Sequence, residues 1–244
     1  MNNKKILVII PARGGSKRII KKNIKKICGQ PMIFWPLYEL SKNFKSNEIL
    51  ISSDDDEIIA LIESIGLEVP FKRPENLADD FTGTVPVSSH ALDWYEKNVK
   101  KVDYVLIVYP TAILLNIEDI NSSLKILEQD KKCDLVFSAC KFPYPIQRAV
   151  YLNDKGYAKM FQPDHYSSRS QDLQVAWQDA GQFYLYRSKS LRSEKNIKNA
   201  NVKLKILSKN MVIDIDDEED FTLAESKLKH LEKDKVKMNF KFKN

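Results

Sequence analysis

Cationic side chains and two adjacent glycines lie together in the sequence PARGGSKRIIKK, residues 11–22. Glycine lets a backbone pass close to a ligand, so Gly14 and Gly15 are predicted to turn their N–H groups toward an anion. Arg13 can bind two phosphate oxygens at once, and Lys17 supplies a mobile point charge. With Lys21 and Lys22, this loop is predicted to bind a triphosphate and its departing pyrophosphate.

The basic loop matches neither of two common phosphate-binding motifs. The chain has no GxxxxGK[ST] sequence, which excludes a P-loop, and no GxGxxG after the first apolar run, which excludes the dinucleotide fingerprint. The alternative interpretation is a solvated basic loop on a structural turn.

A second group of charged residues lies in NMVIDIDDEEDF, residues 210–221. The apolar alternation predicts a strand over Met211–Ile215, which places Asp214 and Asp216 on one face. Two carboxylates at this spacing are able to hold one Mg²⁺, which usually takes one or two carboxylates together with substrate phosphates and water. The four acids that follow are typical of the start of a helix.

The order of apolar segments predicts what positions these two groups. Strands are expected at Ile6–Ile10, Glu48–Ser52, Tyr104–Val108, Leu135–Ser138, Gln182–Tyr186 and Lys203–Leu207, and helices at Met32–Leu40, Asp54–Ile65, Val85–Val99, Ile117–Gln129 and Glu218–Leu231. Strands that alternate with helices indicate an α/β fold with a mostly parallel sheet that is flanked by helices on both faces. In such a sheet, ligands bind beyond the carboxyl ends of the strands, where the loop 11–22 is placed.

The predicted domain covers residues 1–230, and residues 141–180 interrupt its regular alternation. This interval contains prolines, several tyrosines and no clear helix, and it is interpreted as a small antiparallel arm that protrudes from the sheet. Residues 231–244 are expected to form a basic tail, solvated and then disordered.

Composition and charge disfavour several classes of protein. The net charge is +6, but residues 1–30 hold nine Lys or Arg and no acid, and residues 227–244 hold seven Lys against two acids, so the body of the chain is acidic. A nucleic-acid-binding protein would spread its basic charge over one face. No apolar run is long enough to span a membrane, and three cysteines without a CxxC motif are typical of a reduced, cytoplasmic protein.

A family resemblance extends over nearly the whole chain, from Ile6 to about Leu228. Seven segments occur in a familiar order: IPARGGSKRIIKKNI, ISSDDDEI, RPENLADD, YPTA, RSQDL, DAGQFY and IDIDDEEDF. This order is similar to that of the CMP-sugar-acid synthetases, the cytidylyltransferases that activate nine-carbon nonulosonic acids. Within the family, YPTA, RSQDL and DAGQFY look more like the pseudaminic acid branch, that is, pseudaminic acid cytidylyltransferase, than the N-acetylneuraminic acid branch.

The resemblance implies a three-layer, Rossmann-like nucleotidyltransferase fold. It also implies transfer of CMP from CTP to a 2-keto sugar acid, with release of pyrophosphate and Mg²⁺ as the cofactor. It assigns the nucleotide to Ala12, Arg13, Gly14, Gly15, Ser16, Lys17, Lys21, Lys22, Asn23, Arg73, Thr82 and Thr84. It assigns the sugar acid to Tyr109, Gln147, Arg148, Arg169, Gln171 and Gln182, and the metal to Asp214 and Asp216. The expected catalytic residues are Arg13, Lys17, Lys22, Asp214 and Asp216.

The family is usually dimeric, so a homodimer is expected, with the arm 141–180 reaching the neighbouring site. Alternatives remain open at this point. The same reaction on legionaminic or N-acetylneuraminic acid is a near alternative, and an enzyme that uses another nucleotide is a second. A non-catalytic module that binds RNA through the basic loop and tail is a more distant one, and it leaves the acidic body unexplained.

Overall fold

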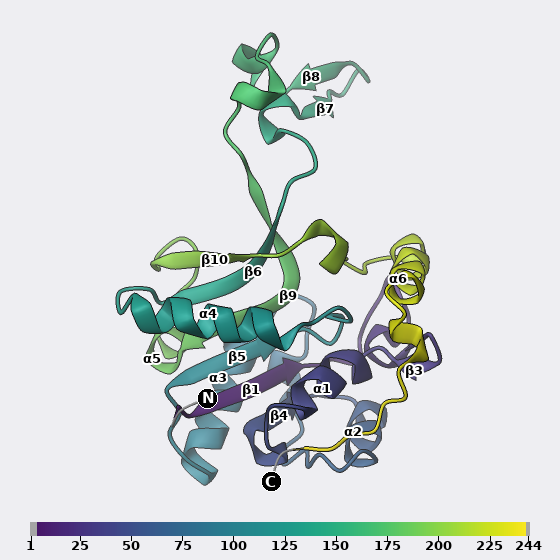
Figure 1. The fold of residues 1–244 in the computed structure, drawn as a ribbon, viewed down its shortest axis with the longest axis vertical. Helices are drawn as coiled ribbons and strands as arrows, with labels where there is room; N and C mark the ends of the chain where they lie inside the picture. The colour runs from purple at the N-terminus through teal and green to yellow at the C-terminus, as the bar shows by residue number, and fades with distance from the viewer. Residues whose placement is uncertain (1–3, 243–244) are drawn as a thin grey trace.

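The computed structural model describes residues 4–242 and contains a six-stranded mixed sheet (Figure 1). The strands lie in the order β10-β6-β9-β5-β1-β4. Their bounds are β1 (Ile6–Pro11), β4 (Ile49–Ser52), β5 (Tyr104–Val108), β6 (Leu135–Lys141), β9 (Trp177–Arg187) and β10 (Val202–Ile206). The pairs β1–β4, β1–β5 and β10–β6 are parallel, whereas β9 is antiparallel to both of its neighbours. The predicted α/β class and the mostly parallel sheet are confirmed.

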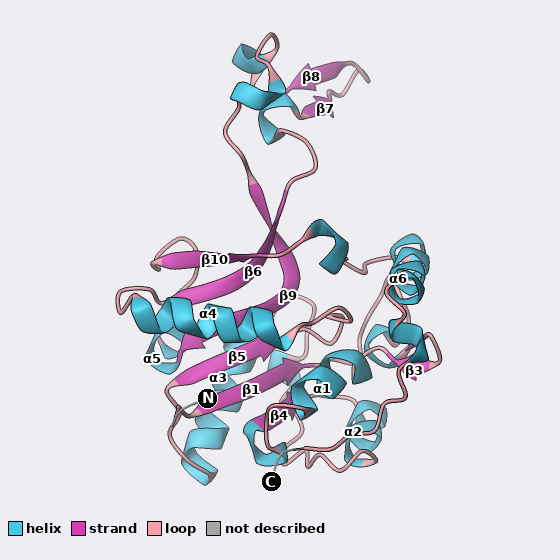
Figure 2. Ribbon diagram, viewed as in Figure 1, coloured by secondary structure: helices cyan, strands magenta, loops and turns pink. Residues whose placement is uncertain are grey.

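Helices cover both faces of the sheet and make three layers (Figure 2). Their bounds are α1 (Phe34–Ser41), α2 (Asp56–Glu63), α3 (Thr84–Asn98), α4 (Ile117–Gln129), α5 (Ser188–Arg192) and α6 (Glu218–His230). Buried residues of α1, α2 and α4 share one apolar core with the sheet, and those of α3 and α5 share the other. No helix within residues 4–242 has both the length and the apolar character needed to cross a membrane.

Strand β1 shows why the sequence forms this arrangement. Its side chains alternate between the two cores: Val8 and Ile10 lie in the first and Leu7 and Ile9 in the second, all of them fully buried. A strand that is covered on both faces requires a continuous apolar run, which Ile6–Ile10 provides. The charged segment that follows is therefore delivered to the carboxyl edge of the sheet.

A third, smaller core holds α6 against the loop that follows β1. Three buried side chains lie in it: Ile19 of that loop, Ile215 before α6, and Leu228 of α6. Met211 and Ile213 pack against it. The predicted strand over Met211–Ile215 is wrong, because residues 212–216 pair with no neighbouring strand. The apolar alternation here reflects packing beneath α6, and the packing brings Asp214 and Asp216 toward the basic loop.

Residues 142–176 leave the sheet between β6 and β9 and project far beyond it (Figure 1). The projection carries a small antiparallel hairpin of β7 (Val150–Leu152) and β8 (Ala158–Met160). The antiparallel character of this segment agrees with the prediction. We call residues 142–176 the arm.

The C-terminal segment differs from the solvated, disordered tail that was expected. After α6 the chain runs back along the body, and Met238, Phe240 and Phe242 pack against the first core. The ring of Phe240 meets that of Phe34 edge-on, with centroids 5.1 Å apart. Burial of apolar rings outweighs the freedom of the chain end here. Residues 243–244 of the predicted tail lie outside the described residues.

Candidate active site

A pocket of about 580 Å³ opens at the carboxyl ends of β1 and β5. Nine of the residues that the sequence assigned to substrates line it: Arg13, Ser16, Lys17, Lys22, Asn23, Arg73, Thr82, Thr84 and Tyr109. These residues come from segments up to 96 positions apart in the sequence. The parallel topology brings them together, as expected for a site at the rim of such a sheet.

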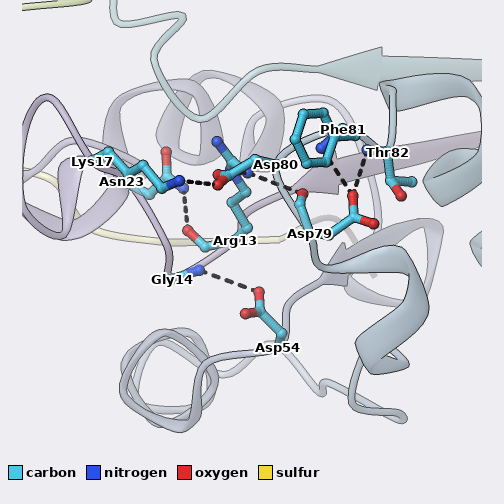
Figure 3. A network of polar contacts seen from close by, with 9 residues as sticks. All are labelled: Arg13, Gly14, Lys17, Asn23, Asp54, Asp79, Asp80, Phe81 and Thr82. Carbon is cyan, nitrogen blue, oxygen red and sulfur yellow. Dashed lines mark hydrogen bonds and ion pairs between the residues drawn. The ribbon is translucent and has the colours of Figure 1, made fainter.

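The basic loop is held by side chains from two neighbouring segments (Figure 3). Arg13 Nη1 donates to Asp80 Oδ1 at 2.8 Å and to the Asp79 carbonyl at 3.0 Å. Lys17 forms an ion pair with the other oxygen of Asp80. Asn23 Nδ2 donates to the Arg13 carbonyl at 2.9 Å, which fixes the start of the loop. The cations that suit a triphosphate therefore face a protein carboxylate.

Gly14 lies against the start of α2. Its N–H donates to Asp54 Oδ1 at 3.2 Å, and a Cβ placed on it would come within 2.3 Å of Asp55 Oδ2. Asp55 is the N-cap of α2 and accepts the N–H groups of Glu57 and Ile58. The triple aspartate therefore starts a helix, as predicted, and also anchors the basic loop. A Cβ placed on Gly15, by contrast, would meet no atom within 4 Å.

Lys22 connects the pocket to the acidic segment that precedes α6. Its Nζ donates to the Ile215 carbonyl at 2.7 Å and to Asp216 Oδ1 at 3.3 Å. Arg18, which also lines the pocket, meets the same oxygen of Asp216 at 2.9 Å. Desolvation raises the pKa of the Asp214 carboxyl, and the nearby Asp216 carboxylate adds to that effect. The two carboxylates therefore lie beside cations of the basic loop.

Lys21, the sequence neighbour of Lys22, points away from the pocket. Lys21 adopts a left-handed backbone conformation, and its Nζ forms an ion pair with Glu57 of α2. Its side chain is 52% exposed, against 21% for Lys22, and it is not among the residues that line the pocket. Adjacent lysines of the predicted site thus have different surroundings.

Arg73 forms the buried wall of the pocket. Its Nε donates to Ser52 Oγ at 3.0 Å, and its Nη2 donates to the Ser52 carbonyl at the end of β4. Burial lowers the pKa of this guanidinium. Near it, Thr84 Oγ1 at the start of α3 lies 3.1 Å from the Oη of Tyr109, which follows β5. This end of the pocket offers hydroxyl groups and one buried cation.

Behind Tyr109 lies a short polar chain on β9. The rings of Tyr109 and Tyr184 are 5.5 Å apart, and Tyr184 Oη donates to Asp179. Burial raises the pKa of the Tyr184 hydroxyl, and Tyr109 and Asp179 add to the effect. Gln182 is buried, and its amide donates to the Met211 carbonyl, so it fixes the segment leading to Asp214.

The remaining predicted residues lie outside the pocket lining. Ala12 is fully buried at the end of β1, and Gly14 and Gly15 shape the loop. Asp216 contacts Lys22 of the pocket, and Asp214 lies two residues before Asp216. Four predicted sugar ligands lie on the arm, away from the pocket of their own chain: Gln147, Arg148, Arg169 and Gln171. Arg169 there pairs with Asp172 at 2.7 Å.

Sequence reasoning did not assign eight of the residues that line the pocket, among them Arg18, Asp80 and Phe81. Arg18 sits within the basic run, so its charge was the available signal. No local pattern gives the role of Asp80, because its partner Arg13 is 67 positions away. Among residues 4–242, no group of three or more His, Cys, Asp or Glu side chains is placed to hold a metal ion.

Solved structures share the fold. A CMP:2-keto-3-deoxy-manno-octonic acid synthetase complexed with CTP superposes with a TM-score of 0.67 at 15% identity, covering 94% of this chain and all of that one. A cytidylyltransferase from Leptospira borgpetersenii gives a TM-score of 0.61 at 13% identity, covering 98% of this chain and 90% of that one. At such identities these structures show the architecture.

Curated sequences are more similar. The pseudaminic acid cytidylyltransferase of Campylobacter jejuni serotype O:2 is 39% identical over 90% of this chain and 94% of its own length. The N-acylneuraminate cytidylyltransferase of Escherichia coli O18:K1:H7 is 26% identical over 90% of this chain and 51% of its own length. No support for an RNA-binding module comes from these relatives. The cytidylyltransferase family model matches residues 7–236, and the chain belongs to the cytidylyltransferase family.

Proposed function

We propose that this enzyme transfers CMP from CTP to the anomeric hydroxyl of pseudaminic acid and releases pyrophosphate. The observation that carries the proposal is the pocket at the carboxyl ends of β1 and β5, where Arg13, Lys17 and Lys22 line one cavity and Lys22 contacts Asp216. The 39% identity to the Campylobacter jejuni pseudaminic acid cytidylyltransferase favours this sugar over the legionaminic and N-acetylneuraminic acids.

The chain's own residues act mainly by positioning and by neutralising charge. The anomeric oxygen forms a bond to the α-phosphorus while the bond from that phosphorus to the pyrophosphate oxygen breaks, so negative charge grows on the leaving group. Arg13, Lys17 and Lys22 are placed to stabilise that charge. The buried Arg73 and the hydroxyls of Thr82 and Thr84 give a rigid end of the pocket for the cytidine.

Asp214 and Asp216 are the residues we assign to Mg²⁺. The fit rests on their chemistry: they are two neighbouring carboxylates, and desolvation, followed by the nearby Asp216 carboxylate, raises the pKa of Asp214, so a cation would stabilise its charged form. Mg²⁺ takes one or two carboxylates and completes its shell with phosphate and water. When bound, the ion supplies charge neutralisation at the phosphates and lowers the pKa of the attacking hydroxyl.

Replacing Asp214 with asparagine is expected to lower the rate of pyrophosphate release by about 30- to 100-fold, because the isosteric amide binds a cation poorly. Release is measured with CTP and Mg²⁺ against pseudaminic, legionaminic and N-acetylneuraminic acids. Glu219→Gln is the matched control, since it removes an exposed charge from the same acidic run and should change the rate less than about twofold.

The outcomes separate the substrate from the metal site. Release with another sugar acid would keep the cytidylyltransferase and discard pseudaminic acid as its substrate. A full rate in Asp214→Asn, or an equal loss in Glu219→Gln, would remove Asp214 from the metal site.

We also propose that two copies of the chain form a dimer in the cytoplasm, with each arm completing the neighbour's sugar site. The arm exposes large apolar side chains, among them Tyr144, Leu152 and Tyr166 at 80, 72 and 80% exposure. Arg148 and Arg169 are cations suited to a sugar carboxylate, yet they lie far from their own pocket (Figure 1). A second copy would cover the apolar surface and bring these cations to a pocket.

Mixing two impaired variants tests the exchange of arms. Lys22→Met impairs the pocket of its own chain, and Arg169→Ala impairs the site that its arm completes. In a mixed dimer one site combines an intact pocket with an intact arm, so activity is expected to rise about tenfold or more above either variant alone. Mixing Lys22→Met with Lys22→Met/Arg169→Ala is the control and should restore nothing. Lack of recovery in a proven mixed dimer would contradict the exchange.

A further inference from the structure

The Asp80 carboxylate pairs with two cations of the basic loop, Arg13 and Lys17. One oxygen accepts from Arg13 at 2.8 Å and the other pairs with Lys17, so both oxygens are engaged (Figure 3). The Lys17 ammonium, followed by the Arg13 guanidinium, holds the pKa of the Asp80 carboxyl below its usual range, so it is an anion at neutral pH. A carboxylate thus stands where a phosphate would find its partners.

The segment around Asp80 is shaped to hold the carboxylate in that place. Asp79 Oδ1 accepts the N–H groups of Phe81 at 2.9 Å and Thr82 at 2.6 Å, which closes a turn. The Asp79 carbonyl accepts a second bond from Arg13. The turn therefore directs the side chain of Asp79 inward to its own backbone and that of Asp80 toward the cations.

The contact is open to exchange. Lys17 is 80% exposed, Arg13 37% and Asp80 34%, and ion pairs with this exposure contribute little to stability. A polyphosphate carries more negative charge and more acceptor oxygens than one carboxylate, so it offers the same cations more charge-assisted hydrogen bonds. An incoming polyphosphate can therefore take over Arg13 and Lys17, and Asp80 can return to them when the anion leaves.

We propose that Asp80 is an internal competitor for the polyphosphate group: it weakens the binding of pyrophosphate at Arg13 and Lys17 and thereby favours its release. The inference rests on the proposed function for the identity of the leaving group. In this role Asp80 is a positioning residue that acts through the two cations. Asp80 lowers the affinity of the site for every ligand that binds Arg13 and Lys17. The lower affinity matters most for pyrophosphate, because this product must dissociate before the next turnover.

The test is a calorimetric titration of the full chain with sodium pyrophosphate. Asp80→Asn keeps the size of the side chain and removes its charge, and we expect it to bind pyrophosphate about three- to tenfold more tightly than the wild type. In the enzyme assay, the inhibition constant for pyrophosphate and the KM for CTP should fall by similar factors. Asp80→Ala serves as the second variant, and thermal unfolding verifies that both are folded.

Glu57→Gln is the matched control. Glu57 pairs with Lys21 of the same loop and touches neither Arg13 nor Lys17, so its loss should change pyrophosphate affinity less than about twofold. Unchanged or weaker binding in both Asp80 variants overturns the inference, as does an equal gain in Glu57→Gln. The sugar-acid assay tests the proposed function separately, because the pyrophosphate titration requires no turnover.

Discussion

Replacing Lys22 with methionine is expected to lower kcat/KM for CTP by about 10²- to 10³-fold, which is the usual effect of removing one donor from a preorganised, charge-stabilising site. Lys22 Nζ lies between the pocket and Asp216, so it is able to contact the phosphates while it holds the acidic segment. Lys21→Met is the matched change on the neighbouring residue. It removes only an exposed pair with Glu57 and should cost less than about threefold.

Steady-state kinetics of both variants, with CTP varied at saturating sugar acid, give the comparison. Equal losses would mean that the basic run acts as a diffuse positive charge. A loss confined to Lys21→Met would reverse the assignment of the two lysines. Denaturant unfolding of both proteins shows whether a lower rate has a structural origin.

Gly14→Ala is expected to lower the free energy of unfolding by about 1–3 kcal/mol and to weaken CTP binding at least tenfold. The added methyl group would lie 2.3 Å from Asp55 Oδ2 and 2.8 Å from its Cβ, so either the loop or the N-cap of α2 must move. Loss of an N-cap alone costs about 1 kcal/mol. Position 14 therefore requires glycine because Asp55 leaves no space for a Cβ.

Gly15→Ala is the matched control for Gly14→Ala, since a Cβ at position 15 meets nothing within 4 Å. This variant should unfold within about 0.5 kcal/mol of the wild type. Denaturant unfolding and a CTP titration of the two alanine variants measure the difference. Two equally stable variants would show that the loop relaxes easily around Asp55.

The sequence predicted those parts of the site that depend on local pattern. The apolar run Ile6–Ile10 had to be a buried strand, and a buried parallel strand delivers the following loop to the ligand-binding rim. The placement of Arg13, Lys17 and Lys22 followed from this rule alone. The contacts of Asp80 did not, because they depend on how a turn 67 positions away folds onto the loop.

Apolar alternation was misread in one place and overlooked in another. At Met211, Ile213 and Ile215 it suggested a strand, but these side chains pack beneath α6 and their backbone has no partner strand. At Met238 and Phe240 the same alternation marks a segment that packs along α1, although the surrounding lysines suggested a solvated tail. Alternation shows that one side of an extended segment is buried; what covers that side depends on the tertiary structure.

Strand β9 has a consequence for how the protein is made. It lies between β6 and β5 in the sheet, yet it is synthesised after both of them and after the whole arm. A nascent chain that ends before residue 177 therefore holds β5-β1-β4 as one fragment and β6 apart from it, each with an open edge. Open edges pair readily with other chains. These edges stay open while the ribosome completes the arm, which exposes the growing protein to aggregation during that interval.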